Sequence, residues 1–143
     1  MFRQLTDSVY ASPQIDIAAV AKARELGITL IVNNRPEGES DDQVPGSDIA
    51  AAANAVGIEY VAIPVSHAGF AQNQVAAMAD ALDRATGPVL AYCRSGTRST
   101  LLWALARAKA GEDPARLAEQ AAAAGYDVSA VRQVMDMLAS ERG

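Results

Sequence analysis

The stretch around the single cysteine carries the residues best suited to chemistry. Residues 89–92 form an apolar run, Cys93 follows it directly, and residues 94–99 contain a glycine, two arginines and three hydroxyl side chains. This order predicts a buried strand, a tight loop and a helix. The N–H groups of such a loop converge on one point, and the N-terminus of the following helix adds partial positive charge. The sequence therefore predicts a reactive thiolate that faces an anion site.

Each residue of this loop has an expected role. Cys93 is the expected nucleophile, and the positive charges of Arg94 and Arg98 favour its thiolate form. Arg98 is expected to hold an oxyanion by a two-pronged contact, and Ser99 to donate its hydroxyl hydrogen to the sulfur. Gly96 allows a backbone conformation that other residues resist. The predicted substrate-binding residues of the loop are Arg94, Ser95, Gly96 and Thr97. The alternative is a buried cysteine without chemistry, which is common for free cysteines.

Composition and charge narrow the classes of function. The chain has 143 residues, of which 50% are hydrophobic and 20% charged, as expected for one globular domain over residues 1–143. The net charge of −5 argues against a nucleic acid or an anionic membrane as partner. One cysteine excludes an internal disulfide, and with one histidine it cannot form a usual zinc site, so we expect no metal and no cofactor. No segment reads as a signal peptide or a membrane span, which predicts a cytoplasmic location.

Strands and helices alternate along the chain. Apolar runs predict strands at residues 9–11, 28–32, 60–64 and 89–92. Helices are predicted at residues 17–26, 47–57, 75–84, 99–110, 114–124 and 128–140. This alternation predicts an α/β domain with a mainly parallel sheet and helices on both faces. Ligands of such sheets bind beyond the carboxyl ends of the strands, so the three loops that follow the later strands should form one site.

Two of these loops supply further candidates. His67 is the sole histidine, and it could protonate a leaving group or bind an anionic donor; a surface histidine without a role is an equal alternative. Arg35 follows the strand at residues 28–32, where bracing of the cysteine loop is favoured over contact with substrate. Asp41 and Asp42 lie in the same loop, and they are predicted to form a solvated acidic surface.

The order of these segments resembles a known family. Residues 8–110 are similar in order to the cysteine-based phosphatases of the dual-specificity type. Residues 33–38 and 92–99 more closely resemble a bacterial family, the phosphatase-like domain of beta-lactamase hydrolase-like proteins, whose members are described as phosphatases or as sulfur transferases. This resemblance implies the dual-specificity-phosphatase fold.

Three departures from the phosphatase pattern favour sulfur chemistry. Four residues separate Cys93 from Arg98, which resembles the spacing of rhodanese-type sulfurtransferases, whereas the phosphatases have five. The loop after residues 60–64 lacks the carboxylate that serves the phosphatases as general acid, and Tyr92 stands where they usually carry histidine. A shorter loop leaves less room for a phosphoryl group, and expulsion of sulfite from thiosulfate needs no acid.

We therefore expect a sulfurtransferase that moves sulfur from thiosulfate or a persulfide through a Cys93 persulfide. The first alternative is a phosphatase that hydrolyses phosphate monoesters through a phosphocysteine at Cys93, with His67 or water as the acid. The second is a non-catalytic domain that binds an oxyanion or a persulfide. All three imply a small anionic ligand, and all leave the oligomeric state open.

Overall fold

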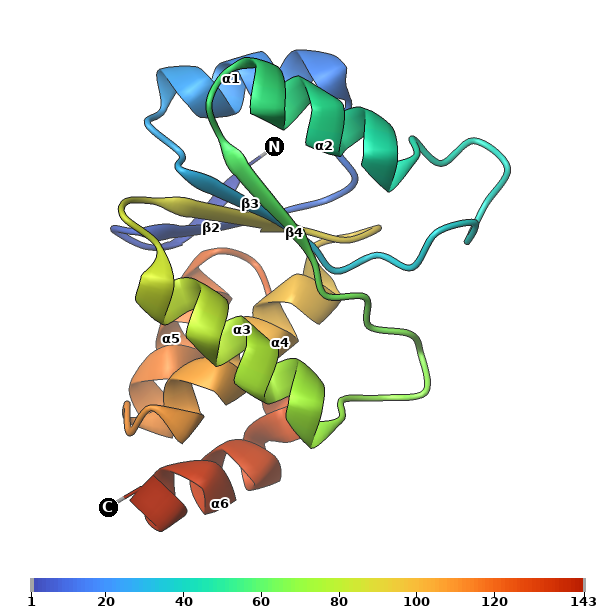
Figure 1. The fold of residues 1–143 in the computed structure, drawn as a ribbon. Coiled ribbons are helices and arrows are strands. Elements are labelled where there is room, and N and C mark those ends of the chain that lie inside the picture. Colours follow the sequence, from blue (N-terminus) through green and yellow to red (C-terminus); the bar gives the residue numbers. More distant parts are fainter. Residues whose placement is uncertain (1, 143) are drawn as a thin grey trace.

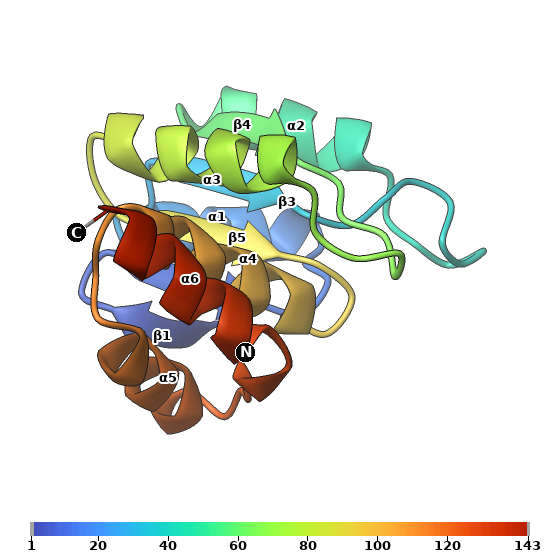
Figure 2. The ribbon, with the colours of Figure 1, turned by 90° about the horizontal axis from the view of Figure 1, so that it is seen from below.

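The computed structural model describes residues 2–142 and shows a five-stranded sheet between two layers of helices (Figures 1 and 2). The strands are β1 (Arg3–Thr6), β2 (Val9–Ser12), β3 (Leu30–Asn33), β4 (Glu59–Ala62) and β5 (Val89–Tyr92). Their order across the sheet is β1-β2-β5-β3-β4, with β1 antiparallel to β2 and the remaining pairs parallel. The predicted α/β class with a mainly parallel sheet is confirmed.

Helices cover both faces of the sheet. On one face lie α1 (Ile17–Glu25) and α2 (Gly46–Ala55) (Figure 1). On the other face lie α3 (Gln72–Arg84), α4 (Thr97–Lys109), α5 (Pro114–Ala123) and α6 (Arg132–Arg142), the last preceded by the 3-10 helix η1 (Ser129–Val131). Alternate residues of a strand point to opposite faces, so β5 sends Leu90 into one apolar cluster and Ala91 into the other.

Strand β1 was not predicted, and its sequence explains why. Of its four residues, only Leu5 is buried, and the others are polar. An edge strand with one apolar side chain gives no alternating pattern, so only its pairing with β2 defines it. The remaining strands and helices agree with the prediction to within a few residues. No helix among residues 2–142 is both long and apolar enough to cross a membrane.

The carboxyl ends of the parallel strands bring three loops together. Asn33 at the end of β3 is in register with Tyr92 of β5 and with Ala62 of β4. The loops are joined by their backbones, because the Asn34 N–H donates to the Tyr92 carbonyl at 2.8 Å and the Val65 N–H donates to the Asn34 carbonyl at 2.9 Å. The predicted gathering of these loops at one edge of the sheet is therefore present.

Candidate active site

Cys93 lies directly after β5, and the loop that follows turns back over its sulfur. The Gly96 N–H donates to Cys93 Sγ at 3.1 Å. Gly96 has a φ of +93°, in the left-handed region, and α4 begins at the next residue. This turn aims a backbone donor and a helix N-terminus at the sulfur, and both stabilise negative charge there. The predicted strand, loop and helix are all present, although α4 begins two residues earlier than predicted, at Thr97.

Arg98 lies in the first turn of α4 and is held by an acidic partner. Its Nη1 and Nη2 each donate to one carboxylate oxygen of Glu39 at 2.8 Å, and Nη1 also donates to the Val65 carbonyl at 2.7 Å. Hydrogen bonding from Arg98 is the main cause that lowers the pKa of Glu39 to about 2. Glu39 is therefore charged at neutral pH. Its carboxylate accepts the two-pronged contact from Arg98 that we expected a substrate oxyanion to accept.

The same guanidinium lies close to the sulfur. The pKa of Arg98 is raised, first by its hydrogen bond to Glu39, and the neighbouring Cys93 contributes to the same shift. A guanidinium has five N–H donors, and three of those of Arg98 donate to Glu39 and to the Val65 carbonyl. Its Nε–H and one Nη2–H remain, and they form one edge that can take an oxyanion in a fork.

Arg35 is buried beside this ion pair and braces it. Its Nε donates to Glu39 Oε1 at 2.9 Å, and its two terminal nitrogens donate to Gln14 Oε1 at 3.0 Å and to Ser40 Oγ at 3.1 Å. Only 4% of Arg35 is exposed. Through these contacts Arg35 holds Gln14, Glu39 and Ser40 together beside Arg98.

The Ser99 hydroxyl does not have the partner that we expected. It donates to Asn34 Oδ1 at 2.8 Å instead of to the Cys93 sulfur, and Asn34 Nδ2 donates in turn to the Ile63 carbonyl at 2.9 Å. Both side chains are fully buried. Their hydrogen bonds connect α4 to the loops that follow β3 and β4, and in this way Ser99 and Asn34 help to hold the cysteine loop in position.

The exposed side of the loop forms a cleft of about 470 Å³. Its lining residues are Ser66, His67, Gly69, Phe70, Arg94, Ser95, Thr97, Arg98 and Leu101. His67 and Arg94 are exposed there, so the structure brings the candidates from two loops together. Cys93 is fully buried and does not line the cleft, and access to its sulfur therefore requires a shift of the surrounding residues.

Glu39 and Tyr126 also belong to the site, although no sequence motif predicted them. The Tyr126 hydroxyl donates to the Ser95 carbonyl at 3.2 Å. That carbonyl and the Gly96 N–H belong to one peptide group, so this hydrogen bond orients the donor that reaches Cys93 Sγ. The Arg3 guanidinium lies 5.4 Å from the centre of the Tyr126 ring and supports it. No local motif marks either residue, because both act across loops that only the fold brings together.

Comparison with known proteins identifies relatives of this chain. Residues 1–110 match the family described as "Beta-lactamase hydrolase-like protein, phosphatase-like domain". A beta-lactamase hydrolase-like protein of Agrobacterium fabrum is 36% identical over 85 residues, which are 59% of this chain and 20% of that protein. The chain thus matches about a fifth of the length of this curated relative.

Solved structures share the fold along nearly the whole chain. A candidate phosphatase from Neisseria meningitidis is 31% identical with a TM-score of 0.83, and the match covers 95% of this chain and 96% of that one. TpbA of Pseudomonas aeruginosa, solved as a Cys-to-Ser variant in complex with phosphotyrosine, has a TM-score of 0.63 at 20% identity; the match covers 94% of this chain and 90% of TpbA.

These relatives overturn the predicted sulfurtransferase activity. The matching family is described as phosphatase-like, and the Neisseria structure, which is 31% identical, is that of a candidate phosphatase. The prediction gave too much weight to the number of residues between Cys93 and Arg98. The position of the Arg98 guanidinium also depends on Glu39 and on the Val65 carbonyl, so loop length alone does not set the size of the anion site.

Proposed function

Because the chain belongs to the phosphatase-like domain family of the beta-lactamase hydrolase-like proteins, we propose that it hydrolyses phosphate monoesters through Cys93. The observation that carries this proposal is the environment of the sulfur. Cys93 Sγ accepts the Gly96 N–H at 3.1 Å, and it lies at the N-terminus of α4, close to the Arg98 guanidinium. This arrangement stabilises a thiolate and offers donors to a phosphoryl group beside it.

The reaction follows from these groups in two steps. The Cys93 thiolate attacks phosphorus, an S–P bond forms, and the ester P–O bond breaks with its electron pair on the leaving oxygen. The free edge of Arg98 and the loop N–H groups hold the phosphoryl oxygens, whose charge grows in the transition state. Water then attacks the phosphocysteine, which releases inorganic phosphate and restores the thiolate.

The leaving oxygen needs a proton, and His67 is the residue that we assign to donate it. His67 lines the cleft with Arg94 and Arg98, where its imidazole can reach a leaving oxygen and donate a proton to it. Glu39 is excluded from this role, because its pKa of about 2 keeps it charged and both of its oxygens accept from arginines.

An aryl phosphate is the substrate class that the cleft favours. Phe70 and Leu101 supply apolar surface next to the cationic side chains of Arg94 and Arg98. This combination suits an aromatic ring that carries a dianionic phosphate. The structural similarity to TpbA, which was solved with phosphotyrosine, supports the same class.

Leaving-group dependence tests the role of His67. The His67→Gln variant should hydrolyse phenyl phosphate much more slowly than the wild type, while p-nitrophenyl phosphate, whose leaving group needs little protonation, should be nearly unaffected. Gln133→Ala, on the exposed side of α6, is the matched control. Equal losses for both substrates in His67→Gln would refute proton donation by His67 and leave water as the donor.

A further inference from the structure

An apolar groove continues the substrate cleft along α4. It measures about 490 Å³ and lies where α4 runs between α3 and α6 (Figure 2). Phe70 lines both this groove and the cleft that holds His67 and Arg98, so the two hollows meet at the Phe70 side chain. A substrate that is larger than its phosphate-bearing group can therefore extend from the cleft into the groove.

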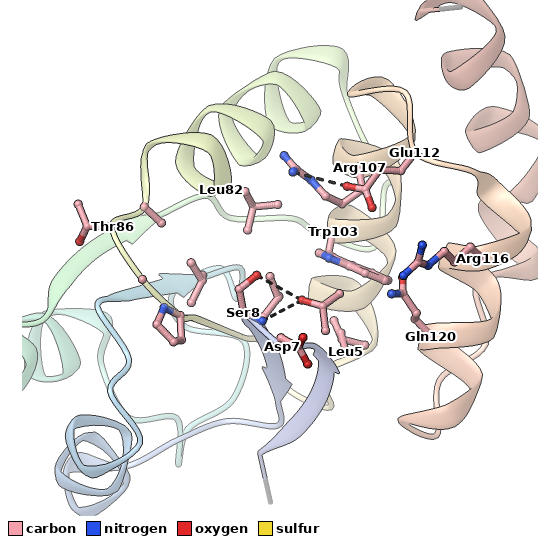
Figure 3. A pocket seen from close by; sticks show the side chains of 16 residues that line it. Leu5, Asp7, Ser8, Leu82, Thr86, Trp103, Arg107, Glu112, Arg116 and Gln120 are labelled. Atoms are coloured by element: carbon pink, nitrogen blue, oxygen red, sulfur yellow. Dashed lines mark hydrogen bonds and ion pairs between the residues drawn. The ribbon is translucent and has the colours of Figure 1, made fainter.

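One side of α4 forms the floor of both hollows. Leu101 lines the cleft, and Leu105 and Lys109 line the groove; because these residues are four apart, they follow one another along the same side of the helix. At a rise of about 1.5 Å per residue, the floor runs about 12 Å from Leu101 to Lys109. Trp103 and Arg107 lie on the opposite side of α4 and line a separate cavity near the first residues of β2 and β5 (Figure 3).

The walls of the groove hold apolar side chains that a ligand can contact. Val134 and Met137 on α6 are 42% and 54% exposed, and they are two of the four large apolar side chains that are exposed among residues 2–142. Phe70 and Leu138 are half-buried in the same walls. Single exposed apolar residues are common on protein surfaces, but a group of them around one groove is typical of a binding surface.

The charges at the two ends of the groove favour a peptide as the ligand. Arg98 lies at the end that opens into the cleft, and Lys109, the last residue of α4, lies with Glu141 at the other end. A long alkyl chain would place methylene groups against these charged side chains, which costs free energy. A peptide can place an apolar side chain in the middle of the groove and its polar backbone near the ends. The net charge of −5 also disfavours a substrate in an anionic lipid surface.

We propose that this groove binds an apolar side chain of a phosphotyrosine peptide whose phosphotyrosine enters the cleft. This inference rests on the proposed phosphatase function and narrows the substrate class from aryl phosphates in general to peptides. An extended peptide covers about 3.3 Å per residue, so four residues span the distance of about 12 Å from Leu101 to Lys109. The groove therefore selects an apolar residue within four positions of the phosphotyrosine.

Phosphopeptides that differ in a single residue test this selection. Each peptide has a phosphotyrosine in a background of serine and alanine, and one leucine is placed in turn at each of the four positions on either side. Leucine at one or two of these positions should raise kcat/KM of the wild type by about three- to tenfold, the value of a partly buried leucine side chain. Equal kcat/KM for all peptides would overturn the proposal. A larger gain in kcat/KM from butyl phosphate to decyl phosphate would assign the groove to an alkyl chain and would overturn it as well.

Two variants locate the effect on α6. Met137→Gln keeps the length of an exposed side chain and removes its apolar surface, so the preference for leucine should fall by about twofold or more. Hydrolysis of p-nitrophenyl phosphate, which fills only the cleft, should not change. Leu26→Gln is the matched control, because Leu26 is also exposed and apolar but follows α1 on the other face of the sheet; this variant should keep the full preference.

The two assays separate failure of the groove from failure of the phosphatase function. A full preference for leucine in Met137→Gln, with p-nitrophenyl phosphate hydrolysed normally, would overturn the assignment of the groove alone. A folded wild type that does not hydrolyse p-nitrophenyl phosphate would refute the phosphatase function, and this inference with it.

Discussion

Replacement of Glu39 by glutamine isolates the charge that holds Arg98. In the folded chain the pKa of Glu39 is lowered from 4.5 to about 2, chiefly by the hydrogen bond from Arg98. At about 1.4 kcal/mol for each pH unit, this shift corresponds to about 3.5 kcal/mol of stability as an upper limit. The Glu39 side chain is 16% exposed, and solvent screening reduces the expected contribution to about 1–2 kcal/mol.

The sign of the pH dependence follows from the direction of the shift. A carboxyl group whose pKa is lower in the folded chain stabilises fully above its unfolded pKa and loses that effect as the pH falls through the folded value. Glu39→Gln should therefore be less stable than the wild type by about 1–2 kcal/mol at pH 7. The difference should shrink steadily below about pH 5 and approach zero near pH 2.

Urea unfolding at a series of pH values measures this difference. Trp103 is fully buried and is the only tryptophan, so its fluorescence reports the unfolding of the core. Asp41→Asn removes a negative charge from the exposed part of the same loop and serves as the control, with little effect expected at any pH. A stability difference between wild type and Glu39→Gln that stays constant from pH 7 to pH 3 would refute the role assigned to the ionised carboxylate.

Two further substitutions test the loop itself. Tyr126→Phe keeps the ring and removes the hydrogen bond to the Ser95 carbonyl. Alkylation of Cys93 by iodoacetamide should therefore slow by about two- to tenfold, while the free energy of unfolding changes by no more than about 1 kcal/mol. An unchanged alkylation rate would show that the phenol does not orient the loop. Arg98→Lys should lower kcat for an aryl phosphate by about 100-fold in a steady-state assay. An ammonium group cannot donate to both Glu39 oxygens and at the same time present two parallel N–H donors to phosphate. A near-normal kcat would count against this role of the guanidinium.

The parts of the site that the sequence predicts are those encoded locally. The apolar run before Cys93 and the glycine after it are enough to predict a strand, a turn and a helix, and the alternation of elements predicts the parallel sheet. The partner of Arg98 could not be predicted in this way. Glu39 lies 59 positions away in the sequence, and only the path of the loop after β3 brings its carboxylate to the guanidinium. The two acidic residues that we did consider, Asp41 and Asp42, lie on the exposed side of that loop.

The predicted chemistry failed for a related reason. Loop length can be counted from the sequence, whereas the side chains that complete an anion site come from other elements. Arg98 is placed by Glu39 and by a carbonyl of the loop after β4, and the peptide that faces the sulfur is oriented by Tyr126 from beyond α5. Spacing within residues 93–98 carries no information about these partners.

Trapping the covalent intermediate tests the proposed role of Cys93 directly. The wild-type chain is mixed with p-nitrophenyl phosphate, quenched during turnover, and analysed by peptide mass spectrometry beside Cys93→Ser. We expect the wild type to release p-nitrophenol and to carry a phosphoryl group on the Cys93 peptide, and we expect no turnover by the folded Cys93→Ser variant. Turnover that persists in Cys93→Ser, or a folded wild type that releases no p-nitrophenol, would contradict this role.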